Sequence, residues 1–333
     1  MKKILLFAGF LLSVGAYAQK DTAFSYRPEL HGTFRSKYEY QTGEGKGRFE
    51  VRNARASIEG KVLPKVSYKA EIDLSDEGSI KMLDAYGRLT LMQGLNLTAG
   101  QMRVPFTIDA HRSPHKQFFA NRSFIAKQVG NVRDVGAMVA WQPSNVPLII
   151  EGGLFNGSGL TNQKNYWTSR LNYSAKVQAI LPGGLTLEGS VQQIRPDSVA
   201  EHLWDVGATW QVGRWTLEAE YLRKYYAHDA FSAVDAFDAM VRYRIPLRST
   251  ALSLLTRFDF MDKHSDGTSD KTTGRLTTTD AARQRLTMGV TWHLSHPLTA
   301  EVRANFEKYW YHGEGTPKIS ERDKAVLELM IHF

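Results

Sequence analysis

Cysteine is absent from the chain of 333 residues. Its absence excludes disulfide bonds, thiolate metal sites and a cysteine nucleophile. Long apolar runs are also absent after residue 18, although a transmembrane helix needs about 20 consecutive apolar residues. The sequence therefore excludes a helical membrane protein and predicts a fold that is stabilised without disulfides.

The common signatures of catalytic chemistry are missing as well. The chain has no GxSxG nucleophile elbow, no HExxH zinc motif and no glycine-rich phosphate loop. Its ten histidines are scattered, and His111 and His115 lie in a segment without a carboxylate pair that resembles a metal site. We predict no enzyme activity, no cofactor and no metal site. A hydrolase built from residues far apart in the sequence is an alternative, because it leaves no local motif.

Acidic residues are fewer than basic ones, with 34 Asp and Glu against 42 Lys and Arg, so the formal net charge is +8. Such a surplus fits nucleic acid, acidic lipid or small anions as partners, and composition does not choose among them. The hydrophobic fraction of 42% suits a soluble protein. It suits a membrane barrel with a wet interior equally well, since only alternate residues of such a barrel face lipid.

The first 18 residues have the pattern of a secretory signal. Lys2 and Lys3 precede the apolar run 4–14, and Ala16-Tyr17-Ala18 forms a small-x-small cleavage motif. The apolar run is too short to span a bilayer. We predict a signal peptide over 1–18 and one mature domain over 19–333.

Segments with a two-residue period recur through the mature domain. In the last of these segments, apolar residues alternate with more polar residues. A period of two places the two sets of residues on opposite faces of a strand. Similar alternation runs through 65–74, 215–221, 252–260 and 298–307. Charges on one face of strand after strand predict a water-filled interior, although a β-sandwich produces similar alternation. The apolar set of the last segment is Ala325, Leu327, Leu329, Ile331 and Phe333, and the other set includes Lys324, Glu328, Met330 and His332.

Between these segments, short connections alternate with connections that are mostly longer. This alternation is typical of outer-membrane barrels, which have short periplasmic turns and longer extracellular loops. We predict an all-β fold, namely a transmembrane antiparallel β-barrel of about sixteen strands in the bacterial outer membrane, whose last strand pairs with its first. The short turns lie near 63–64, 93–94, 143–147, 182–184, 212–213, 246–249 and 295–297, and the longer loops lie at 41–47, 75–79, 105–133, 156–165, 195–202, 227–232, 263–280 and 312–320.

Residues 105–133, the third of the longer loops, form the longest segment without a strand pattern. We predict that this loop folds into the lumen and lines a constriction with cations, which favour anions through charge-assisted hydrogen bonds. The alternative is a basic loop on the outer surface that contacts lipopolysaccharide phosphates. Against the single acidic residue Asp109, the loop carries Arg112, Lys116, Arg122, Lys127 and Arg133.

A set of short motifs occurs in order along the mature chain: FEVRNAR (49–55), YKAEID (68–73), LDAY (83–86), AGQMRVPF (99–106), NRS (121–123), DVG (134–136), LFNG (154–157), EAEYLRK (218–224), MGVTW (288–292) and the terminal Phe333. Together these motifs resemble the family of phosphate-selective porins O and P. The resemblance implies a sixteen-stranded barrel that is usually a homotrimer, with a third outer loop folded inward and arginines that pass phosphate-like anions.

Two positions matter for transferring the family's anion contacts to this chain. Family members often show paired arginines where this chain has Arg52-Asn53, so one contact is missing, and Arg55 is the candidate substitute. Arg122 lies in the matching motif of the constriction loop. The complete set of candidate solute-path residues is Arg55, Arg112, Lys116, Arg122, Lys127 and Arg133.

These observations predict a homotrimeric outer-membrane porin for the passive diffusion of small anionic solutes such as phosphate. Its other partners are outer-membrane lipid and lipopolysaccharide, and no nucleic acid is expected. The alternatives are a general porin without useful selectivity, a lipid hydrolase embedded in a barrel, and a structural barrel that anchors the envelope.

Overall fold

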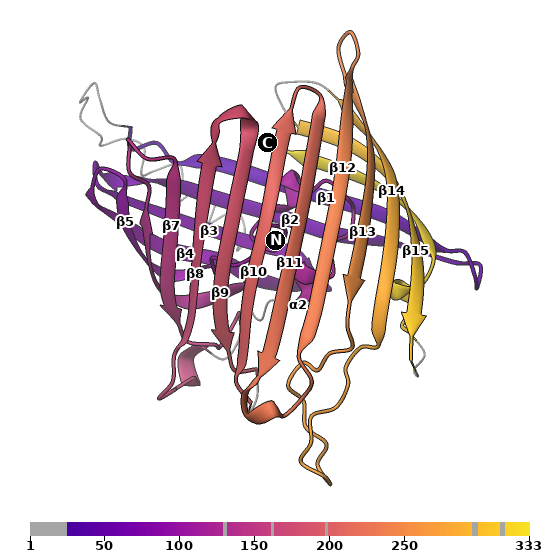
Figure 1. Cartoon of the computed structure of the whole chain (residues 1–333). Coiled ribbons are helices and arrows are strands. Elements are labelled where there is room, and N and C mark those ends of the chain that lie inside the picture. The colour runs from indigo at the N-terminus through magenta and orange to yellow at the C-terminus, as the bar shows by residue number, and fades with distance from the viewer. Residues whose placement is uncertain (1–24, 129–131, 161–162, 197–198, 295–298, 314–316) are drawn as a thin grey trace.

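The computed structural model describes residues 25–128, 132–160, 163–196, 199–294, 299–313 and 317–333. The predicted signal peptide, residues 1–18, lies outside these described residues. The described chain consists mainly of strands joined by turns, loops and a few short helices (Figure 1). In the described ranges, no helix combines the length and the apolar character needed to cross a membrane.

Sixteen strands form one antiparallel sheet in which consecutive strands are hydrogen-bonded. The structure thereby confirms the predicted all-β barrel and its number of strands. The strands are β1 (Glu29–Gln41), β2 (Lys46–Leu63), β3 (Val66–Asp76), β4 (Ser79–Met92), β5 (Leu95–Arg103), β6 (Arg133–Trp141), β7 (Leu148–Phe155), β8 (Asn172–Leu181), β9 (Leu185–Ile194), β10 (Glu201–Val212), β11 (Trp215–Tyr226), β12 (Val234–Pro246), β13 (Ala251–Met261), β14 (Ala282–Leu294), β15 (Thr299–His312) and β16 (Lys324–His332). The short helices are the 3-10 helices η2 (Pro114–Lys116), η3 (Gln163–Asn165), η4 (Pro182–Gly184), η5 (Ala227–Asp229) and η6 (Ile319–Glu321), and the single-turn α-helix α2 (Ile125–Gln128).

The first and last strands close the sheet into a barrel. β1 pairs with β16 over nine residue pairs, from Thr33↔His332 to Gln41↔Lys324. Beyond this ladder, the amide of Gly32 donates to the carbonyl of Phe333 at 2.8 Å. The ring of Phe333 lies over position 32, where a Cβ atom would be 2.3 Å from it, so a larger residue there would displace this ring. The prediction that the last strand pairs with the first is confirmed.

The two faces of the wall differ in polarity as expected for a barrel with a polar interior. On β16, Glu328 is fully buried, whereas Leu327 is 54% exposed. The buried carboxylate of Glu328 contacts the guanidinium groups of Arg35 at 2.6 Å and Arg303 at 2.9 Å. Apolar side chains outside and ion pairs inside are the reverse of a soluble sandwich, so the sandwich alternative is wrong.

Long and short connections lie at opposite ends of the barrel. In Figure 1, the long orange connection 262–281 projects away from the end that carries the short turn 247–250. The longest connection, 104–132, joins β5 to β6. The predicted loop extended to residue 133, but Arg133 already belongs to β6, because it pairs with Arg103 in the β5–β6 ladder.

Candidate functional site

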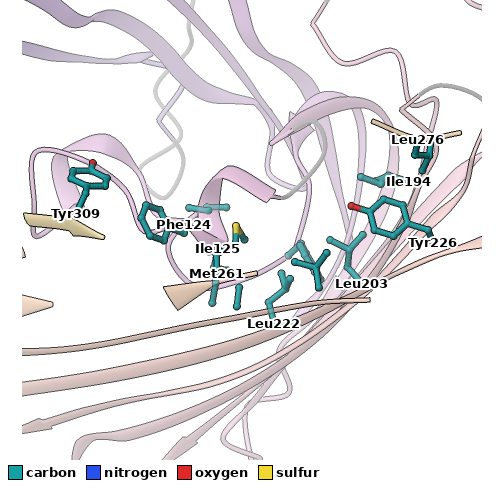
Figure 2. Close-up of a cluster of buried hydrophobic side chains, with 14 residues drawn as sticks. Phe124, Ile125, Ile194, Leu203, Leu222, Tyr226, Met261, Leu276 and Tyr309 are labelled. Carbon is teal, nitrogen blue, oxygen red and sulfur yellow. The ribbon is translucent and has the colours of Figure 1, made fainter. Parts of the chain in front are cut away.

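Residues 104–128, which we call the β5–β6 segment, are the larger described part of the longest connection. Although these residues form a loop, most of their large apolar side chains are buried, and Phe106, Phe124 and Ile125 are at most 1% exposed. Figure 2 shows Phe124 and Ile125 in one buried cluster with Leu222 of β11 and Met261 of β13. The segment therefore packs on the barrel wall instead of extending into solvent.

Hydrogen bonds hold the β5–β6 segment to strands that are far apart in the sheet. The Arg35 guanidinium on β1 donates to the carbonyl of Ala120 at 2.8 Å. The Lys176 ammonium on β8 donates to the carbonyl of Thr107, also at 2.8 Å. Additional contacts are those of the Ile108 amide with Glu220 at 2.5 Å, the Ala120 amide with Asn305 at 2.9 Å, and the Phe124 amide with Asp259 at 3.2 Å.

Phenylalanine rings of the segment lie against arginine side chains. The guanidinium carbons of Arg112 and Arg242 each lie 4.7 Å from the centre of the Phe118 ring. That of Arg285 lies 4.6 Å from the centre of the Phe124 ring. Cation–π contacts contribute about 0.5–2 kcal/mol each, with the larger values for desolvated pairs. The wall residues Arg242 and Arg285 therefore hold the segment in place.

Among the predicted solute-path residues whose side chains the structure describes, three are engaged in ion pairs. Because these guanidinium groups are compensated by carboxylates, they contribute less net field to the barrel interior than isolated cations. The pairs are Arg55 with Asp73 at 2.9 Å, Arg112 with Glu218 at 3.1 Å, and Arg133 with Asp84 at 2.6 Å.

Arg122 differs from these three residues because its guanidinium donates hydrogen bonds to backbone carbonyl groups. Its guanidinium donates to the carbonyl of Arg112 at 2.9 Å and to that of Asp109. Burial lowers the pKa of Arg122 to about 10, with Asp109 opposing that shift and Arg35 adding to it. Arg122 thus remains charged at neutral pH. Lys127 belongs to α2, but its side chain lies outside the described part of the chain.

Lys116 lies in a cavity of about 260 Å³ between η2 and the strands β1, β2, β3 and β16. Its side chain is exposed, and no hydrogen bond or ion pair of its ammonium occurs among the described residues. Arg55 and Lys69 also line this cavity, together with the carboxylates of Glu59 and Glu71. Thus the structure brings two of the predicted residues, Arg55 and Lys116, to one place.

Two histidines of this cavity were not among the predicted site residues. The rings of His115 and His332 are stacked, with centroids 3.7 Å apart and planes inclined by 5°. The stack joins η2 to β16. Burial lowers the pKa of His115 to about 3, and His332 and Lys116 add to this shift, so the His115 ring is neutral at pH 7. The alternation of the last strand placed His332 on the polar face, but it did not indicate a contact with residue 115.

Comparison with known proteins gives one family and one fold. The model of the family of phosphate-selective porins O and P matches residues 24–201, which is more than half of the chain. No curated protein sequence matches the chain.

Solved structures with a similar fold include a porin, an outer-membrane channel and an outer-membrane protein. The anion-selective porin from Comamonas acidovorans is 11% identical, with a TM-score of 0.63 over 92% of this chain and 98% of that chain. The channel DcaP of Acinetobacter baumannii is 15% identical, with a TM-score of 0.62 over 95% and 99% of the two chains. The trimer form of OmpT from Vibrio cholerae is 11% identical, with a TM-score of 0.63 over 92% and 98%. At these identities the similarity shows the fold alone.

Proposed function

The chain belongs to the family of phosphate-selective porins O and P, and from this premise we propose that it lets small anions, phosphate among them, diffuse passively across the outer membrane. Family and fold together make the protein an outer-membrane porin. Porins are channels and not enzymes, so neither the lipid hydrolase nor the structural barrel has support.

The proposed selectivity depends on a β5–β6 segment that crosses the channel and narrows it. Its contacts with Arg35 on β1 and Lys176 on β8 support this placement. In the closed order of strands, β1 and β8 are separated by six strands in one direction and by eight in the other. The binding of one segment to inner side chains of two strands so far apart supports a segment that spans the bore.

The observation that carries the anion preference is the position of Lys116. Its ammonium is exposed in the cavity and has no partner among the described residues, so it is available to a passing anion. Arg122 adds a charge whose hydrogen bonds go to carbonyl groups, and the carboxylate of Asp109 is its nearby acidic group. Arg55, Arg112 and Arg133, which have carboxylate partners, act mainly as structural anchors in this proposal.

Reversal potentials in planar bilayers under a KCl gradient test this function. We expect a potential of the sign that indicates chloride preference, and we expect added phosphate to reduce the chloride current by occupying the same path. A cation-preferring channel contradicts the proposal. A channel without preference identifies the protein as a general porin.

The proposed lipid contacts are the apolar outer face and its aromatic residues. Four tryptophans lie at strand ends beside short turns, and each is between 43% and 48% exposed. Tryptophan is enriched at membrane interfaces, where its amphipathic ring sits at the level of the head groups. Lipopolysaccharide is the proposed partner at the opposite end, where the long loops lie. The four tryptophans are Trp141, Trp210, Trp215 and Trp292.

We also propose that three copies associate in the membrane. The trimer form of OmpT, which has a similar fold, supports this assembly. Light scattering of the detergent-solubilised protein, corrected for bound detergent, should give three times the mass of one mature chain. A mass of one chain across a range of protein concentrations contradicts the trimer.

A further inference from the structure

One histidine and two glutamates meet where β1 begins and β2 ends. Glu29 and His31 are two residues apart on β1 and therefore share a face, and Glu59 on β2 pairs directly with Glu29. The Nε2 atom of His31 lies 3.8 Å from Oε2 of Glu29 and 3.6 Å from Oε1 of Glu59. One ligand atom from each of the three side chains lies within 4.8 Å of the other two.

We propose that Glu29, His31 and Glu59 bind a divalent transition-metal ion such as Zn²⁺. Imidazole nitrogen and carboxylate oxygen are ordinary zinc ligands, and a tetrahedral site with bonds of 2.0–2.2 Å places its ligand atoms about 3.3–3.6 Å apart. The distances from His31 are 3.6 and 3.8 Å, and all three ligand atoms lie within 4.8 Å of one another, so movement of the exposed glutamate side chains brings the ligand atoms to this spacing. The side chains of Glu29, His31 and Glu59 are 75%, 35% and 42% exposed, which leaves room for water as a further ligand.

The two carboxylates of the site favour a cation between them. Glu29 and Glu59 face each other across the ladder, and like charges in this position destabilise a sheet. Lys69 compensates part of this charge, because its Nζ atom lies 3.5 Å from Oε2 of Glu59, whereas the Nε2 atom of His31 lies nearest to Oε1. At 3.6 and 3.8 Å, the His31 ring is too far from either carboxylate to hydrogen-bond with it. A metal ion provides the bridge that these side chains lack.

The site adjoins the proposed solute path. His31 and Glu59 line the cavity that contains Lys116, and Glu29 and Glu59 line a neighbouring cavity of about 360 Å³. A bound dication cancels two negative charges at this border, so it raises the anion preference of the channel. This second effect rests on the proposed function, whereas metal binding itself does not.

Zinc titration of the mature protein, refolded in detergent and freed of metal, tests the site by calorimetry. We expect one saturable site in the wild type. His31→Ala and Glu59→Gln should each weaken it at least about tenfold, because each removes a ligand. The matched control is His202→Ala, which removes an exposed histidine on β10 and should leave binding unchanged.

Barrel formation is checked by the mobility shift between heated and unheated protein in gel electrophoresis. Glu59→Gln relieves a like-charge contact, so we expect this variant to fold. If His31→Ala does not fold, the zinc titration of Glu59→Gln tests the site. The proposal is overturned if the wild type binds no Zn²⁺, or if both folded variants bind it as tightly as the wild type. A failure of Zn²⁺ to alter the reversal potential, with binding intact, overturns only the effect on selectivity.

Discussion

Lys116→Glu is expected to lower the anion-to-cation permeability ratio by about five- to tenfold. Two unit charges 4 Å apart interact by about 1 kcal/mol in bulk water, so reversing the sign of the side chain changes the energy of a nearby anion by about 2 kcal/mol before screening. A difference of about 1.4 kcal/mol corresponds to a factor of ten. Reversal potentials under a KCl gradient measure the ratio, and the effect should shrink as ionic strength rises.

The matched control is Lys271→Glu. Lys271 is also exposed, and it lies on the connection 262–281 outside the cavity that contains Lys116. The control makes the same change of net charge and should alter the ratio much less. Equal effects of the two substitutions mean that Lys116 does not line the narrowest part of the channel.

Arg285→Ala should both destabilise the barrel and open the channel. Arg285 is fully buried, and its guanidinium lies 3.0 Å from Asp259 and 3.5 Å from Glu307. Removing it leaves two buried carboxylates without this partner, a change that costs about 3–5 kcal/mol in buried ion pairs. It also removes a hydrogen bond of 2.7 Å to the carbonyl of Arg122 and the contact with the ring of Phe124. We therefore expect lower resistance to urea and a larger, noisier single-channel conductance.

Two further variants separate stability from channel width. Arg214→Ala removes an exposed arginine from the turn between β10 and β11, and it should change neither property. Phe124→Ala removes a buried ring of the β5–β6 segment without leaving a charge unpaired, at a cost of about 3–5 kcal/mol. It should raise the conductance as Arg285→Ala does. If both variants lose stability while the conductance stays at the wild-type value, the segment does not narrow the channel.

The barrel could be predicted because its determinants are local. Alternation along a strand follows from the period of two, so Leu327 and Glu328 were placed on opposite faces before their surroundings were known. The number of strands followed from the turns between alternating segments. The exact end of the longest loop was wrong by one residue, because the pairing of Arg133 with Arg103 depends on backbone register and not on side-chain pattern.

The roles of the candidate cations could be predicted only in part. Sequence indicates which side chains are charged, but compensation depends on partners that are remote in the chain. Glu218 is 106 residues from Arg112, and Asp84 is 49 residues from Arg133. Lys116 and Arg112 looked alike in the sequence, yet only Arg112 has a carboxylate partner among the described residues.

The cluster at the start of β1 escaped prediction for a related reason. Metal motifs are recognised by close spacing on a helix or loop, whereas Glu59 meets His31 only through the pairing of β2 with β1. The contact between His115 and His332 likewise joins a loop to the far end of the chain. Such clusters become visible only when the register of the sheet is known.

The ladder between β1 and β16 makes the order of synthesis matter. β1 is synthesised before the other fifteen strands and β16 is synthesised last, so the barrel cannot close until β16 has been made. Until then, both edge strands of the incomplete sheet can pair with strands of other molecules. The polypeptide is therefore expected to reach its membrane unfolded and bound to chaperones. A variant that lacks β16 should aggregate instead of forming a narrower pore.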